Sequence, residues 1–247
     1  MKDMKIKMKN LNTTTLLILS ALFLFSACAS RAGQDQKSDQ QSQKKWYGKK
    51  ANWIGDSIVY GHGTNKPYWD IIRTRLGFSQ VRNYGISGST MTKINASDAT
   101  KSVALRYMNM DNDADLIVIH VGCNDIGRMI AGQYQMGSLT DTVTTTWYGA
   151  CNTVFSGLIN KYPTKKIAVI TPLPWQSATR IQATPYINAL IDSAHQYNLP
   201  VLDLYNESGI CPYNSKHVTA FMPDGLHPNT AGHKRIADRV EEFIRGL

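Results

Sequence analysis

The sequence predicts one α/β domain built on a mostly parallel sheet. After residue 50, short apolar runs alternate with longer amphipathic stretches, which is typical of parallel strands joined by crossover helices. The chain has 247 residues, 43% of them hydrophobic, so it can bury one sizeable core. We therefore expect a three-layer α/β/α sandwich, flavodoxin-like in architecture, over residues 49–247.

The N-terminus is typical of an export signal. Basic residues within the first nine positions precede an apolar stretch from Leu16 to Phe25 and then small residues. This stretch is shorter than the ~20 apolar residues that span a bilayer. We therefore expect a signal peptide over residues 1–27 and a location outside the cytoplasm, in the bacterial cell envelope, on either its periplasmic or its outer face.

The run Phe25–Cys28 resembles the lipobox of bacterial lipoproteins, in which cleavage before cysteine frees its thiol for acylation. The departure is Phe25, where an aliphatic residue is usual. The resemblance implies a membrane anchor at Cys28; the alternative is an ordinary signal peptide with an incidental cysteine. No apolar residue lies between Ala32 and Trp46, so residues 28–48 are expected to form a flexible tether.

The charge distribution argues against a nucleic-acid partner. The net charge is +9, but residues 1–50 carry 10 Lys and Arg against 3 Asp and Glu. The rest of the chain carries 17 basic and 15 acidic side chains and has no basic run.

Five strands are predicted along the chain. The clearest is the third, since its residues are almost wholly apolar and β-branched. The predicted strands are Ala51–Gly55, Ser79–Tyr84, Asp115–Val121, Lys166–Thr171 and Pro200–Leu204. Helices are expected near residues 67–77, 99–109, 141–161, 183–197 and 230–246.

Polar motifs follow the first three strands, at the sheet edge where ligands bind in open α/β folds. They are Gly55–Ser57, Asn83–Gly88 and Gly122–Asp125, and a fourth motif, Asp224–Asn229, lies near the C-terminus. Each is weak alone. In this order they resemble the conserved blocks of SGNH (GDSL-type) hydrolases over nearly all of residues 51–247, although Ile58 replaces the Leu of the eponymous motif.

This resemblance implies a serine hydrolase with an SGNH hydrolase-like fold. A serine hydroxyl is a poor nucleophile near neutral pH, so Ser57 needs a base, and His227 is the candidate. Asp224, three residues before His227, would orient the imidazole. By resemblance, the oxyanion donors are the N–H groups of Ser57 and Gly85 and the side-chain amide of Asn124.

Three further residues are candidates for contact with substrate. His62 follows the nucleophile closely and would line the cleft or belong to a plain loop. Trp175 comes directly after the fourth strand, where it would stack on a sugar ring or cap the core. Tyr60 has the same two interpretations. Asp56 and Asp125 are expected to hydrogen-bond local backbone.

No metal or organic cofactor is expected. Cys123, Cys151 and Cys211 lack metal-ligand spacing and leave room for at most one disulfide. Acyl transfer by a serine triad also needs no cofactor.

The leading hypothesis is an esterase that removes O-acetyl or similar short acyl groups from carbohydrate. A lysophospholipase or thioesterase acting on longer acyl chains is the enzymatic alternative. The alternative of another class is a lipid-anchored glycan-binding module that has lost catalysis. The presence of Ser57, Asn124, Asp224 and His227 together favours the enzyme.

Overall fold

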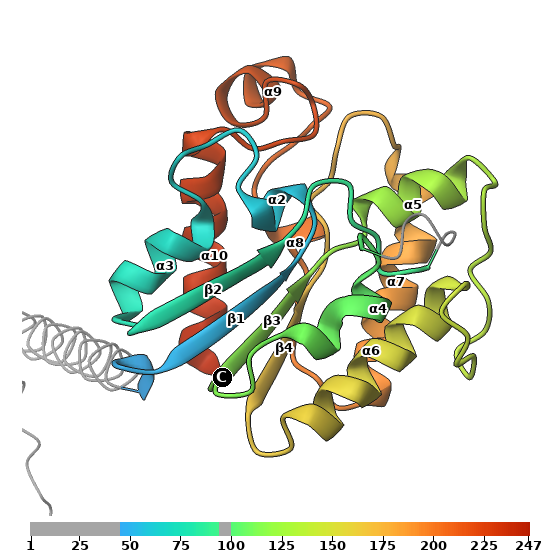
Figure 1. Ribbon diagram of the computed structural model, residues 1–247. Helices are drawn as coiled ribbons and strands as arrows, with labels where there is room; N and C mark the ends of the chain where they lie inside the picture. Colours follow the sequence, from blue (N-terminus) through green and yellow to red (C-terminus); the bar gives the residue numbers. More distant parts are fainter. Residues whose placement is uncertain (1–44, 94–99) are drawn as a thin grey trace, which may run out of the picture. The chain divides into compact units, whose positions relative to one another are not determined.

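Five parallel strands form one sheet, in the order β2-β1-β3-β4-β5 (Figure 1). The computed structural model describes residues 45–93 and 100–247, and the folded unit runs from Trp46 to Leu247. The α/β class is confirmed, and this sheet is wholly parallel. The strands are β1 Lys50–Gly55, β2 Gln80–Gly85, β3 Leu116–His120, β4 Lys166–Ile170 and β5 Val201–Leu202.

Helices cover both faces of the sheet, which gives the three layers (Figure 1). Helices α3 (Tyr68–Leu76) and α10 (Thr230–Gly246) pack on one face. Helices α4 (Val103–Arg106), α6 (Trp147–Lys161) and α7 (Arg180–Gln196) pack on the other. The shorter elements are α2 Ser57–Tyr60, the 3₁₀ turn η2 Tyr107–Asn109, α5 Cys123–Ile130, α8 Leu204–Glu207 and α9 Ser215–Phe221.

Strand β3 lies in the middle of the sheet and is buried on both faces. Leu116 and Val118 join the core beneath α3 and α10, whereas Ile117 and Ile119 join the core beneath α6 and α7. Successive side chains of a strand point to opposite faces, so a strand covered on both sides must be apolar throughout. This explains the uninterrupted apolar run in the sequence.

Capping side chains move three boundaries away from the expected ones. Strand β5 is short because Asp203 N-caps α8, with its carboxylate accepting from the N–H of Asn206 at 3.3 Å. Helix α6 begins after the cap residue Thr146 rather than near residue 141. Helix α7 begins earlier than expected because Thr179 and Gln182 form a capping box.

The packed unit begins a few residues before the expected boundary at residue 49. Trp46 is buried, donates from its indole nitrogen to the carbonyl of Ile244 at 3.0 Å, and contacts the ring of Phe78. The predicted signal peptide, Cys28 and most of the predicted tether lie outside the described residues. Among the described helices, none combines the length and the apolar character needed to cross a bilayer.

Candidate active site

Ser57 lies at the carboxyl end of β1, as the first residue of α2. The carboxylate of Asp56 caps this helix by accepting the N–H of Ile58 at 3.0 Å. Ser57 is 5% exposed, and its own N–H donates no hydrogen bond within the described part of the chain. A free backbone donor therefore lies beside the serine hydroxyl, as is usual for the first turn of a helix.

A continuous chain of hydrogen bonds joins Ser57, His227 and Asp224. The Nε2 atom of His227 lies 3.0 Å from the Ser57 hydroxyl oxygen, and its Nδ1 atom lies 2.7 Å from Oδ2 of Asp224. These are the contacts that a nucleophile, a general base and an orienting carboxylate require. The three residues come from the two ends of the folded unit, and the structure brings them together as expected.

Local backbone contacts hold the Asp224 carboxylate in its charged form. Its Oδ1 atom accepts the N–H groups of Leu226 at 2.9 Å and His227 at 2.7 Å. Partial burial acts to raise the pKa of Asp224, but the hydrogen bonds from His227 and Leu226 outweigh it and lower this pKa to about 2. The carboxylate is thus ionised at any pH near neutrality.

The N–H of Gly85, which was expected to be an oxyanion donor, already makes a hydrogen bond. Its N–H donates to the side-chain oxygen of Asn83 at 2.8 Å, so this donor is already occupied. A Cβ atom at Gly85 would lie 2.3 Å from the Tyr60 nitrogen and 2.6 Å from the Val59 carbonyl carbon. Glycine is needed here because α2 packs directly on the end of β2.

Gly88, three residues later, offers a donor that is unoccupied. It adopts a φ of 77° in the turn closed by the Ser89 N–H and the Ile86 carbonyl. Its N–H donates no hydrogen bond to any described residue. The carbonyl of Ser89 accepts from the side-chain nitrogen of Asn124 at 2.8 Å, so this turn adjoins Asn124.

The Asn124 amide retains a second N–H, because an amide nitrogen carries two donors and Ser89 takes one. The next residue, Asp125, is fully buried and anchors the same loop: it accepts from the N–H groups of Met91 and Thr92 and from the hydroxyls of Thr92 and Tyr134. Burial raises the pKa of Asp125 to about 6, against the lowering effect of these hydrogen bonds. Such contacts between distant segments leave no signal in a local sequence pattern.

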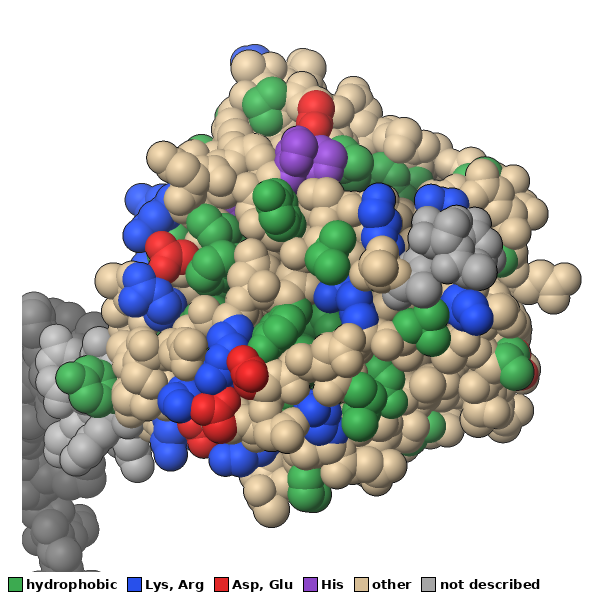
Figure 2. Space-filling model, viewed as in Figure 1, with side chains coloured by type: hydrophobic (Ala, Val, Ile, Leu, Met, Phe, Trp, Pro, Cys, Tyr) green, Lys and Arg blue, Asp and Glu red, His purple; other side chains and the backbone are tan. Residues whose placement is uncertain are grey.

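His62 lies against the imidazole of His227. Its ring centroid is 4.2 Å from that of His227. Its backbone N–H donates to the Ser57 carbonyl at 2.9 Å. Figure 2 shows histidine side chains at the surface of this face, beside hydrophobic ones. His62, Asp224 and His227 are the one group of described residues with ligand atoms close enough to hold a metal ion. Both ring nitrogens of His227 are already hydrogen-bonded, so a metal bound to this ring would have to replace one of these hydrogen bonds.

Tyr60 and Trp175 differ sharply in their exposure. Tyr60 is 58% exposed at the end of α2 and can meet a substrate. Trp175 is 5% exposed and packs edge-on against Tyr205, so of its two interpretations the structure supports the one in which it caps the core. Its neighbour Gln176 donates its N–H to the Gly225 carbonyl at 2.8 Å and so supports the loop that carries Asp224.

Cys123 is buried and inert as a nucleophile. Its thiol donates to the Asp56 carboxylate at 3.3 Å, and burial raises its pKa. Cys123, Cys151 and Cys211, the cysteines of the described part, are unpaired thiols.

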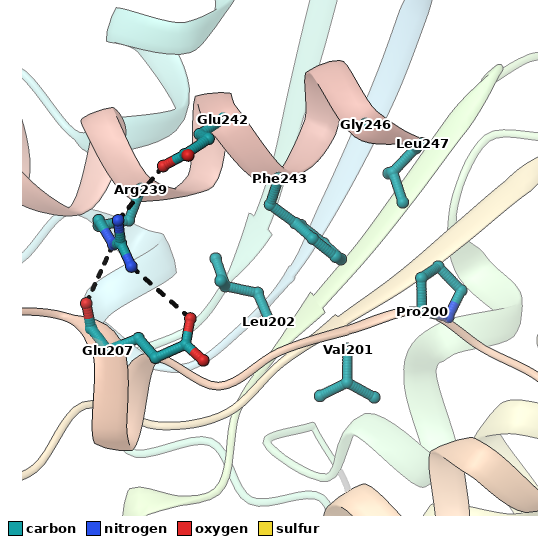
Figure 3. A pocket seen from close by; sticks show the side chains of 9 residues that line it. All are labelled: Pro200, Val201, Leu202, Glu207, Arg239, Glu242, Phe243, Gly246 and Leu247. Carbon is teal, nitrogen blue, oxygen red and sulfur yellow. Dashed lines mark hydrogen bonds and ion pairs between the residues drawn. The ribbon is translucent and has the colours of Figure 1, made fainter.

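Two cavities differ in their relation to this site. A groove of about 460 Å³ lies between β5 and the end of α10, lined by residues that include Val201, Arg239 and Phe243 (Figure 3). It is not lined by Ser57, Asp224 or His227. A cavity of about 560 Å³ is lined by residues that include Gly85, Ile86, Leu105 and Arg106. It therefore adjoins the turn that carries Gly88.

Comparisons with known proteins identify the family of the chain. The sequence matches the GDSL-like lipase/acylhydrolase family over residues 53–235. A solved Lactobacillus plantarum protein is 29% identical, with a TM-score of 0.71 over 81% of this chain and 98% of that chain. No curated protein matches the sequence.

Two solved structures of lower identity share the fold. One, described as a GDSL-like lipase from Bacteroides ovatus, is 16% identical, with a TM-score of 0.58 over 81% of this chain and 99% of its own. The other, an acetylxylan esterase from Geobacillus stearothermophilus, is 20% identical, with a TM-score of 0.56 over 80% of this chain and 94% of its own. Since the family match covers most of the sequence and includes Ser57, Asp224 and His227, the chain belongs to the GDSL-like lipase/acylhydrolase family of ester hydrolases.

Proposed function

We propose that this ester hydrolase uses Ser57 as its nucleophile, His227 as general base and Asp224 as the orienting carboxylate. The observation that carries the proposal is the pair of hydrogen bonds through His227, 3.0 Å to Ser57 and 2.7 Å to Asp224. His227 takes the proton of Ser57 as its oxygen attacks the ester carbonyl, and later gives that proton to the departing alcohol. Water, activated by the same imidazole, then hydrolyses the acyl-enzyme.

Negative charge develops on the former carbonyl oxygen and needs preorganised donors. We assign these to the N–H of Ser57, the second N–H of the Asn124 side chain and the N–H of Gly88. Gly88 replaces Gly85 in this role because the Gly85 N–H is bound to Asn83. The reaction so described needs no cofactor.

For the substrate, we propose short acyl esters, O-acetyl groups on carbohydrate foremost. The similarity in fold to an acetylxylan esterase supports this class. The exposed ring of Tyr60 offers a surface on which a sugar could pack. Trp175 offers no such surface, since its ring is buried.

One observation favours longer acyl chains as the second candidate. The cavity of about 560 Å³ beside the site is lined in part by Ile86 and Leu105, which are 38% and 40% exposed. A lysophospholipase or thioesterase would place an acyl chain there, because ligand pockets bury apolar groups against such side chains.

Acyl-chain profiling separates these two substrate classes. With p-nitrophenyl esters from acetyl to dodecanoyl, we expect kcat/KM to be highest for acetyl and to fall steadily with chain length. A maximum at decanoyl or longer would instead support the lipid substrate and contradict the proposal of an acetyl esterase. Acetate release from acetylated xylan, measured in parallel, tests the carbohydrate part.

Ser57→Ala should abolish hydrolysis of p-nitrophenyl acetate, because it removes the hydroxyl that lies 3.0 Å from Nε2 of His227. We expect kcat to fall by about 10⁴-fold or more. Ser79→Ala is the matched control: Ser79 bonds only to backbone carbonyls at the opposite end of β2, and its loss should leave kcat unchanged. A wild-type protein as inactive as Ser57→Ala would favour a non-catalytic binding module.

Activity should fall on acidification because protonated His227 cannot act as a base. The folded pKa of Asp224, about 2, lies below its ordinary value of 3.8, so the stabilisation from its hydrogen bonds is complete above about pH 4 and is lost only as the pH falls toward 2. Titration of Asp224 therefore does not account for an acid limb of kcat/KM above pH 4. An acid limb centred well below pH 4 would contradict the assignment of His227.

Asp224→Asn should lower kcat by about 10²- to 10⁴-fold.

We further propose that the protein is exported and anchored through a lipid on Cys28. The lipobox-like run Phe25–Cys28 and the apolar-poor stretch that follows it support this location. Expressed in a bacterial host, the full chain should partition into the detergent phase of Triton X-114 and incorporate labelled palmitate. Cys28→Ala should do neither, and equal partition of the two proteins would overturn the anchor.

A further inference from the structure

Arg106 joins three separate backbone segments that meet at the proposed site. It is the last residue of α4, and its guanidinium lies at the carboxyl ends of β1 and β2. The NH1 nitrogen donates to the Tyr84 carbonyl at 2.5 Å, and the NH2 nitrogen donates to the Gly55 carbonyl at 2.8 Å and to the Ser89 hydroxyl at 3.0 Å.

Each of these acceptors belongs to a segment that leads into, or follows, an assigned oxyanion donor. The Gly55 carbonyl belongs to the peptide that leads into Asp56 and Ser57. The Tyr84 carbonyl belongs to the last residue but one of β2, and the loop that contains Gly88 follows this strand. Ser89 follows Gly88 directly, and its carbonyl binds the Asn124 side chain at 2.8 Å. A single rigid, planar cation thus bridges the segments on which all three donors depend.

The guanidinium is held by neutral acceptors rather than by an ion pair. Among the described residues, no carboxylate lies within ion-pair distance of Arg106, and its Nε–H is buried without a partner. Burial lowers the pKa of Arg106 to about 10, while the nearby Asp56 carboxylate acts in the opposite direction, so the side chain is protonated at neutral pH.

Partial burial of an unpaired cation costs stability. The same unneutralised charge favours negative charge developing nearby, because its field is screened less by protein than by water. A purely structural bridge between carbonyls would not need a positive charge.

We propose that Arg106 is a positioning residue of the oxyanion hole. It holds the Ser57, Gly88 and Asn124 segments in register and provides a positive potential behind them. This inference rests on the proposed function, since it concerns the same three donors.

The test compares Arg106→Gln with the wild-type protein on an acetyl ester. We expect kcat to fall by about 10- to 100-fold, somewhat less than the ~10²- to 10³-fold that follows loss of a donor itself. KM should change by less than about threefold, because the donors act on the transition state rather than on the bound ester. The rate of Ser57 phosphonylation by a fluorophosphonate should fall in the same proportion, since that reaction also places charge on an oxygen. Arg106→Lys, which keeps the charge but not the planar fork, should be intermediate.

Arg82→Gln is the matched control. Arg82 is a partly buried arginine on the same strand as Tyr84, where it pairs with Asp111 at 2.8 Å and Asp113 at 2.7 Å, away from the site. Its loss should lower the thermal unfolding temperature without changing kcat or the phosphonylation rate. This control separates a loss of general stability from a loss of transition-state stabilisation.

A folded Arg106→Gln protein with kcat within twofold of wild type would overturn the inference, as would a change confined to KM. If Arg106→Gln does not fold, the same comparison is made with Arg106→Lys, and wild-type kcat and phosphonylation rate there would overturn it. A wild-type protein without Ser57-dependent hydrolysis would overturn the proposed function and this inference together. An active wild-type protein with an equally active Arg106 variant would overturn this inference alone.

Discussion

The close approach of α2 to the sheet is the constraint on which the site depends. Gly55 and Gly85 are register partners at the ends of β1 and β2. A Cβ atom at Gly55 would lie 2.0 Å from the His120 carbonyl oxygen, and one at Gly85 would lie 2.3 Å from the Tyr60 nitrogen. Because these two glycines have no side chain, the chain can turn directly from β1 into α2. Ser57 is thereby placed over the sheet edge with its N–H free.

Buried charges surround this turn, and each has a separate structural task. Asp56 caps α2, Asp125 anchors the loop after β2, and Arg106 bridges the ends of β1 and β2. Burial raises the pKa of both carboxyls and lowers that of the guanidinium, so all three groups are held at a cost in free energy. The cost is offset by hydrogen bonds to backbone groups that would otherwise be buried without partners. Polar groups, as well as apolar packing, therefore determine the geometry of the proposed site.

The sequence predicted the elements whose patterns are local. The first four strands lie within a residue or two of their expected positions, because a strand buried between two helical layers requires an apolar run. The contact between Asp224 and His227 was also predictable, since three residues of a turn are enough to form it. The fifth strand was predicted to run too far, to Leu204. The sequence alone does not show that Asp203 caps α8 instead of continuing the strand.

The errors and omissions concern contacts between distant segments. Trp175 was placed on the rim because it follows a strand, yet it is buried against Tyr205. Gly85 was chosen by its place in a motif, and only the structure shows its N–H bound to Asn83. Arg106 occupies an ordinary position in a short helix, and its three acceptors come from segments 17 to 51 residues away. No local pattern carries that information.

The two halves of the proposed site are stabilised in different ways, and this bears on where specificity can arise. The acid–base half is local: Asp224 and His227 orient each other within one turn, supported by the Gln176–Gly225 contact. The oxyanion half depends on contacts between β1, β2, α4 and α5. Neither half can vary much without loss of catalysis. Substrate choice must then depend on side chains that hold neither half of the proposed site in place. The exposed side chains around the end of β2 are of this kind: Tyr60, Ile86 and Leu105.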